Sequence, residues 1–200
     1  MSQTRTIGLV VIAVIILAGA YFFLGFDGSD FEEAREEINE VWVAEGINIE
    51  KIDFDTSEQL SLTNNELAEM KIKINRIKSK YSSSDDSEAI SAFVEVHLSS
   101  VQIIENINLF VEASYDFDID TTDGESLCVV SLSSFDDLTS LGDSTVSNIK
   151  NHNEKITSFS RNYSKDYSIS VSNLFIEQES FEVSLKNLKS TRKNIEELCE

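Results

Sequence analysis

The chain has 200 residues, of which 36 are acidic and 16 are basic, so its formal net charge is −20. A charge of that sign repels nucleic acid and anionic lipid headgroups, which excludes both as expected partners, and it favours cations, basic proteins or solubility in high salt. The chain contains no proline, which favours long uninterrupted helices over a β-sandwich with many turns.

The first predicted element is an apolar, uncharged run from Ile7 to Phe26. At ~1.5 Å of rise per residue, a helix of this length spans about 30 Å, which matches the hydrocarbon core of a bilayer. Arg5 precedes the run and Asp27 follows it, so the positive-inside rule places the amino-terminal side in the cytoplasm. The sequence therefore predicts a single-pass cell-membrane protein: a cytoplasmic tail (1–6), a transmembrane anchor (7–26) and an extracytoplasmic domain (27–200).

Two other interpretations of the apolar run stay open. A secretory signal peptide could be cleaved after Ala18-Gly19-Ala20, but the run continues through Tyr21 to Phe26, whose aromatic rings suit the interfacial end of a spanning helix. A pilin-type leader would be cut just before the apolar helix, which would then drive filament assembly. Such leaders normally carry an acidic residue shortly inside the helix, and residues 7–26 contain none.

Three helices are predicted in the first half of the extracytoplasmic domain, because apolar residues recur there at the 3–4 spacing of one buried helix face. The first two begin with capping boxes or close approximations of them. The predicted helices run from Asp30 to Gly46, from Thr63 to Tyr81, and from Ser84 or Asp85 to Tyr115. Their apolar faces contain Phe31, Ala34, Ile38, Val41 and Trp42, then Leu67, Met70, Ile74, Ile77 and Tyr81, then Ile90, Val94, His97, Val101, Ile104, Val111 and Tyr115.

Two short segments alternate apolar and acidic residues instead, at Ile52–Asp55 and Tyr115–Asp120. Alternation with period two is the pattern of a half-buried strand. These segments could pair as a minor two-stranded ribbon.

Two long helices are predicted after Gly124, from Cys128 to Tyr163 and from Tyr167 to Cys199. Their narrow apolar stripes suit helices that pack almost antiparallel. Gly142 lowers the helix propensity of the first, so a kink or break is expected near Leu141–Asp143. The fold class predicted is mainly α: a transmembrane helix followed by an antiparallel bundle of about five helices.

The two cysteines, Cys128 and Cys199, lie on the facing stripes of these two helices. In an antiparallel hairpin that turns between Asn162 and Asp166, the residue numbers of facing positions add up to about 328, and those of the two cysteines add up to 327. An extracytoplasmic location would let them form a disulfide that closes a loop of about 70 residues and contributes about 3–4 kcal/mol. In a reducing compartment both would be ordinary thiols.

One acidic segment resembles a calcium-binding loop, because Asp116, Asp118 and Asp120 have the first spacing of an EF-hand. The loop would need glycine where Thr121 stands and glutamate where Leu127 stands. Both departures affect the coordination geometry. A solvated acidic connection is therefore the favoured interpretation, and no metal site is predicted.

The remaining chemical candidates are few. His97 and His152 lie on apolar stripes without the glutamate spacing of a di-iron or zinc motif, so both are expected in or near the core. The sequon Asn162-Tyr163-Ser164 is a glycosylation candidate on the expected turn. No nucleophile elbow, dinucleotide-binding or phosphate-binding motif occurs in the sequence.

These patterns predict a non-enzymatic surface protein without a cofactor. Its acidic bundle would act as an interaction, scaffold or sensing module, held at the membrane by its amino-terminal helix. Its partner would be an unidentified protein or a second copy of the chain. The alternative function is a pilin-like filament subunit that assembles through the apolar helix.

Overall fold

A computed structural model describes residues 29–44, 57–115, 124–167, 169 and 175–199. These ranges contain five packed helices and no strand, which confirms the mainly α class. The helices are α2 (Asp30–Ala44), α3 (Ser57–Lys80), α4 (Ser87–Tyr115), α5 (Gly124–Tyr163) and α6 (Gln178–Cys199).

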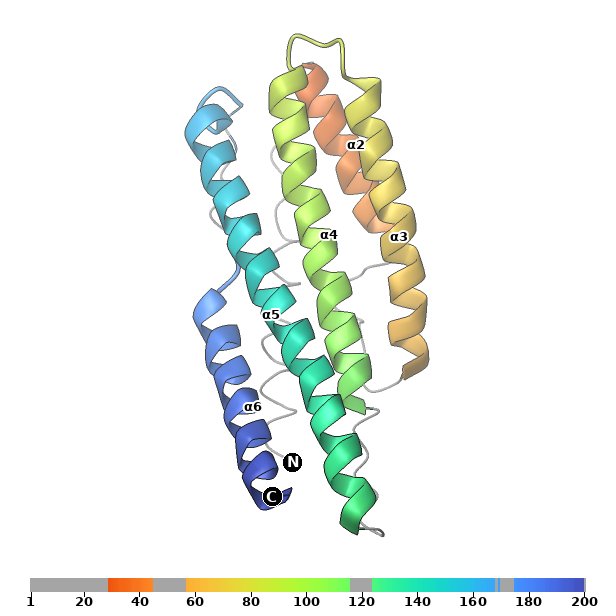
Figure 1. The fold of residues 1–200 in the computed structure, drawn as a ribbon. Coiled ribbons are helices and arrows are strands. Elements are labelled where there is room, and N and C mark those ends of the chain that lie inside the picture. Colours follow the sequence, from red (N-terminus) through yellow and green to blue (C-terminus); the bar gives the residue numbers. More distant parts are fainter. Residues whose placement is uncertain (1–28, 45–56, 116–123, 168, 170–174, 200) are drawn as a thin grey trace.

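The helices α3, α4, α5 and α6 lie side by side in chain order, each antiparallel to the one before it (Figure 1). Their extensive contacts join consecutive helices, and no comparable contact joins α3 to α6 within the described ranges. The short helix α2 packs against α3 and α4 on one face of this row (Figure 1). Among the described residues, the helices therefore form an open row with α2 on one face.

The apolar faces predicted for the first four helices of the domain supply the core, whereas the stripe predicted for the last helix is only partly buried. All five predicted residues of α2 and all five of α3 are at most 9% exposed. A large cluster joins α2, α3, α4 and α5, and a smaller one around Ile103, Ile107, Ile149 and Ile176 fills the space farther along α4 and α5. Because each fully buried large apolar side chain contributes about 1.5–3 kcal/mol, these stripes supply most of the driving force for packing.

The structure corrects three helix boundaries or shapes. The second predicted helix begins at Ser57, six residues before the capping box at Thr63. The last helix begins at Gln178 instead of Tyr167, because Tyr167 belongs to the turn after α5, where its N–H donates to the carbonyl of Tyr163. Ile169 after this turn is 9% exposed. The helix α5 continues through Gly142 without a break. The absence of a side chain at Gly142 makes room there for Leu185 of α6.

Several predictions fall outside the described residues. They are the anchor at 7–26, the paired ribbon segments at 52–55 and 116–120, and the calcium candidate formed by Asp116, Asp118 and Asp120. The side chains of Cys128 and Cys199 are likewise outside the description. Among the helices that the structure does describe, none combines the length and apolar character needed to cross a bilayer.

Candidate functional site

The two histidines of the chain lie in the core where α2, α4 and α5 meet. His97 of α4 is 3% exposed and His152 of α5 is 1% exposed, which confirms that both belong to the core. The sequence already places them on the buried stripes of these helices, each at a position where an apolar residue would otherwise stand. Together with Trp42 of α2 and Ser99 of α4 they form a buried polar layer, hereafter the histidine layer.

Hydrogen bonds join both histidine rings to neighbouring helices, and one of them fixes the proton of His97. The indole N–H of Trp42 donates to Nδ1 of His97 at 3.2 Å, so this nitrogen carries no proton. The hydroxyl of Ser99 donates to the carbonyl of Val96 at 2.7 Å and also shares a hydrogen bond of 2.8 Å with Nδ1 of His152. His97 therefore joins α4 to α2, and Ser99 joins α4 to α5.

Burial holds His97 in its neutral form. Desolvation by the surrounding core, together with the smaller effect of a charge on nearby His152, lowers the pKa of His97 from 6.5 to about 3. The ring of Phe93 contacts His97 edge-on, with centroids 4.5 Å apart. An uncharged histidine packs there as an aromatic residue with one polar bond to α2.

A second polar contact fixes the other end of α2. Asp86, just before α4, accepts a hydrogen bond from the backbone N–H of Phe31 at 3.2 Å and from the hydroxyl of Tyr167 at 2.7 Å. The rings of Phe31 and Tyr167 stack with centroids 4.1 Å apart. The helix α2 is thus held at its first turn by Asp86 and near its last turn by His97.

The sequence shows Asp86 only as one of several acidic residues near a helix start. Its partners lie 55 and 81 positions away, so no local spacing could have identified it. The one available signal was the Ser84-Asp85-Asp86 cluster, which predicts a helix cap and nothing about α2.

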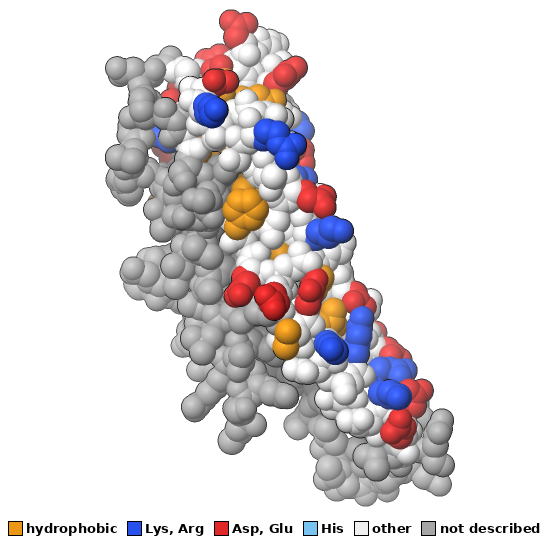
Figure 2. Space-filling view, turned by 90° about the vertical axis from the view of Figure 1, so that its left-hand side faces the viewer, with side chains coloured by type: hydrophobic (Ala, Val, Ile, Leu, Met, Phe, Trp, Pro, Cys, Tyr) orange, Lys and Arg blue, Asp and Glu red, His pale blue; other side chains and the backbone are white. Residues whose placement is uncertain are grey.

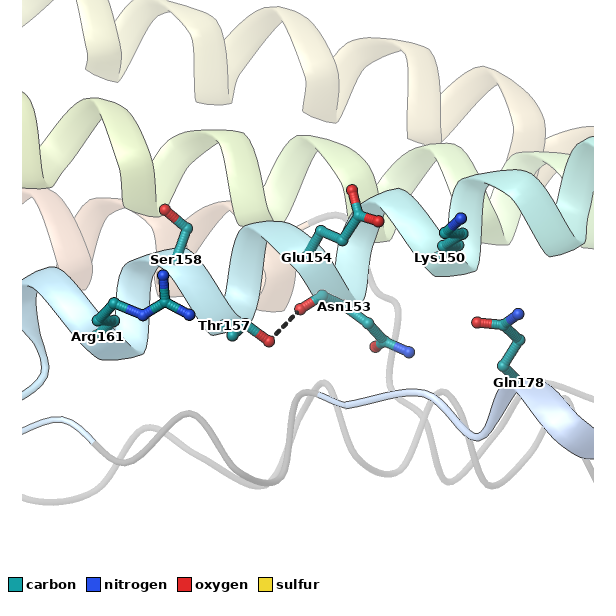
Figure 3. Close-up of a pocket in the computed structure, with 7 residues that line it drawn as sticks. All are labelled: Lys150, Asn153, Glu154, Thr157, Ser158, Arg161 and Gln178. Carbon is teal, nitrogen blue, oxygen red and sulfur yellow. Dashed lines mark hydrogen bonds between the residues drawn. The ribbon is translucent and has the colours of Figure 1, made fainter.

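An open groove of about 360 Å³ lies on the outer side of α5. Figure 3 shows that six lining residues come from α5 and that Gln178 comes from the start of α6. Lys150 and Arg161 stand three helical turns apart with Glu154 between them, so the described lining carries charges of both signs. The other lining residues are Asn153, Thr157, Ser158 and Gln178.

Asn153 ties the chain before α6 to α5. Its side-chain amide donates to the carbonyl of Ile176 at 2.9 Å and accepts from the N–H of the same residue at 3.1 Å. The Asn153 amide thus donates one hydrogen bond to the backbone of Ile176 and accepts one from it, as the backbone of a neighbouring β-strand would. The sequence did not identify Asn153, because its partners are backbone atoms of Ile176, 23 positions away, and backbone atoms leave no sequence motif.

The remaining sequence candidates are not brought together into a site. Asn162 is exposed in the last turn of α5, so glycosylation there stays a prediction. No group of three or more metal-ligating side chains occurs among the described residues. The disulfide and the calcium loop stay predictions, because the side chains of their residues lie outside the part of the chain that the structure describes.

Comparison with known protein families, with characterised proteins and with solved structures finds no match to this chain.

Proposed function

We propose that the chain is a single-pass, membrane-anchored protein whose acidic helical domain acts outside the cytoplasm as a non-enzymatic interaction, scaffold or sensing module. The observation that carries this proposal is the uncharged apolar run at 7–26, which ends four residues before α2 begins at Asp30. A run of that length is stable in a bilayer and costly in water. The helical domain would therefore be held close to the membrane surface.

The outer side of the row supports a contact function. Among the described helices, α6 makes extensive contacts with α5 only. None of the described side chains of α6 is buried. Phe175 and Val183 are 41% and 53% exposed there. Figure 2 shows acidic and basic side chains mixed along this side of the molecule. Such a mixed surface suits a polar, hydrated contact with another protein.

Membrane fractionation of the full chain tests the anchor. We expect the chain to stay with the membranes after alkaline carbonate extraction. Replacing Val14 by Arg should release it, because a charged residue at the bilayer centre costs about 2.5–3.5 kcal/mol on insertion scales. Val14→Leu is the matched control and should stay in the membranes. Recovery of the unaltered chain in the soluble fraction would contradict the proposal.

The amino terminus of the purified membrane protein separates the anchor from its alternatives. An intact 1–26 segment is expected for the anchor. A terminus trimmed within this segment, in material that forms fibres, would favour the pilin-like alternative. A cysteine can be placed at exposed Ser83 in a variant whose Cys128 and Cys199 are replaced by serine. Labelling of this cysteine by a membrane-impermeant reagent in intact cells is expected if the helical domain lies outside.

A further inference from the structure

We infer that the helical domain stands on end at the membrane, with one end of the bundle against the lipid headgroups and its helices directed away from them. This proximal end comprises the start of α2 at Asp30, the turn between α3 and α4 at 82–86, and the turn after α5 at 164–167. The inference rests on the anchor proposed above and adds to it the surface of the domain that meets the lipid.

Hydrogen bonds join the three parts of the proximal end. The backbone N–H of Phe31 in α2 donates to one carboxylate oxygen of Asp86 at 3.2 Å, and the hydroxyl of Tyr167 donates to the other at 2.7 Å. The hydroxyl of Tyr81, at the end of α3, donates to Glu37 of α2 at 2.8 Å. The first turns of α2 are therefore fixed next to both turns of the chain.

The length of the chain before α2 limits how far this end can lie from the bilayer. The apolar run ends at Phe26, and α2 begins at Asp30. An extended chain covers at most ~3.6 Å per residue, so Asp30 lies within about 14 Å of the end of the run. The headgroup layer itself takes up about 5–8 Å of this distance. The start of α2 is therefore held at the membrane surface.

The direction of α2 then orients the domain. The pairs Phe31–Asp86 and Trp42–His97 are both 55 residues apart, so α2 runs parallel to α4. Both helices lead away from the proximal end (Figure 1). Because α5 has 40 residues, the domain extends about 60 Å along this axis at ~1.5 Å per residue.

The side chains of the proximal end suit headgroups and not hydrocarbon. Phe31 and Tyr81 are buried there, at 0% and 6% exposure. The exposed side chains described at this end are small or charged: Asp30, Ser82, Ser83, Asp85, Lys165 and Asp166. With three carboxylates against one ammonium group, this end fits zwitterionic headgroups better than anionic ones.

The sides of the bundle offer a bilayer less. A domain that lies flat on lipid needs a continuous apolar face, as an interfacial helix does. Among the described residues, the large exposed hydrophobic side chains lie singly on different segments: Val43 on α2, Ile72 on α3, Leu109 on α4, Phe175 before α6 and Val183 on α6. Figure 2 shows hydrophobic side chains on one side of the molecule only as small patches among charged ones.

Energy transfer from the domain to the membrane tests the orientation. Ser83→Cys, Ser147→Cys and Ser133→Cys, all at exposed positions, are made one at a time in the full chain without its own cysteines, and each carries a donor dye. Each protein is placed in nanodiscs of zwitterionic lipid that carry an acceptor dye on some headgroups. Ser147 and Ser133 lie 16 and 30 residues before Tyr163, the last residue of α5, which corresponds to about 24 and 45 Å.

We expect strong transfer at position 83, weaker transfer at 147 and loss of nearly all transfer at 133, with a dye pair whose transfer distance is shorter than the ~45 Å between the outer positions. Anionic lipid should leave this order unchanged, because the acidic domain is repelled by it. Circular dichroism checks the helix content of each variant. Exposed Ser190 of α6, near the ion pair of Arg192 and Asp136, is the second distal position if Ser133→Cys does not fold.

Two results would overturn the orientation. Equal transfer at the three positions would mean that the domain lies flat, and the strongest transfer at position 133 would mean that it is inverted. Both results require the chain to stay in the nanodisc. A chain that leaves the lipid contradicts the proposed anchor instead, so the two failures are distinguishable.

Discussion

At the scale of single residues, the buried polar groups decide which segments meet. Asp86 joins the first turn of α2, the start of α4 and the chain after α5, because its two carboxylate oxygens accept from Phe31 and from Tyr167. Asn108 and Asn106 make similar contacts with Asn64 of α3 and Ser144 of α5. Apolar stripes permit many arrangements, whereas a buried hydrogen bond with one distant partner selects among them.

The first prediction concerns Asp86. Replacing Asp86 by Ala removes both acceptors and leaves the N–H of Phe31 unpaired in a partly buried place, so we expect a loss of about 1–3 kcal/mol in the free energy of unfolding. Its neighbour Asp85 is exposed and is the matched control, with an expected change within about 0.5 kcal/mol. Urea unfolding followed by circular dichroism measures both, and equal effects of the two substitutions would contradict the assigned role.

The second prediction concerns Tyr167 at alkaline pH. Burial raises the pKa of Tyr167 from 10.0 to about 12, with a further contribution from its hydrogen bond to Asp86. The folded chain therefore holds this proton more tightly than the unfolded chain. The resulting stability is complete below pH 10 and is lost as the pH rises from 10 to 12. Tyr167→Phe should flatten the pH dependence of stability in this window. It should also reduce the late-titrating part of the tyrosinate absorbance, to which Tyr81, whose pKa is raised by burial, contributes in both proteins.

At the scale of the helices, the spacing of apolar residues predicted the buried helix faces better than the first and last residues of the helices. Every residue predicted on the α2 and α3 stripes is buried, because the 3.6-residue period is a property of the whole helix and tolerates individual exceptions. The ends depend on single residues. Thr63 and Glu66 have the spacing of a capping box, yet the helix begins six residues earlier, at Ser57.

The third prediction concerns the closest approach of α5 and α6. A Cβ atom added at Gly142 would lie 2.6 Å from Cδ1 of Leu185, so Gly142→Ala gains about 1 kcal/mol of helix propensity but forces the leucine to move. In a Leu185→Ala background the contact is absent, and the same substitution should stabilise the chain by up to about 1 kcal/mol. A double-mutant cycle in urea measures the difference, and additive effects would show that the two residues do not touch in solution.

At the scale of the whole molecule, the sequence contained the helix order, the buried faces and the core position of both histidines. It did not contain the partners of Asp86, Asn153 and His97, because these contacts join residues at least 23 positions apart through geometry that no local pattern records. The open row was also not predicted. Amphipathic helices specify that each buries one face, but closure of a bundle depends on which helices lie next to each other.

The register between α5 and α6 leads to the last prediction. The residue numbers of the contacting pair Gly142 and Leu185 add up to 327, and those of the ion pair Asp136 and Arg192 add up to 328, as expected for facing positions. Extended along both helices, this register brings residues 128 and 199 to one level, where two cysteines can be bridged.

We therefore expect material from an oxidising compartment to contain one disulfide between Cys128 and Cys199. Closing a loop of about 70 residues should stabilise the chain by about 4 kcal/mol in the chain-entropy view. Intact mass with thiol labelling before and after reduction detects the bond, and urea unfolding with and without reductant measures its effect. Cys128→Ser and Cys199→Ser should each abolish the difference between these two conditions, whereas the unaltered chain should lose stability on reduction.

Two freely labelled thiols in the oxidised material would mean that the register does not continue to the ends of the helices, or that the domain never leaves a reducing compartment. Labelling after transfer of the purified chain to an oxidising buffer separates these two explanations, because a correct register would then allow the bond to form.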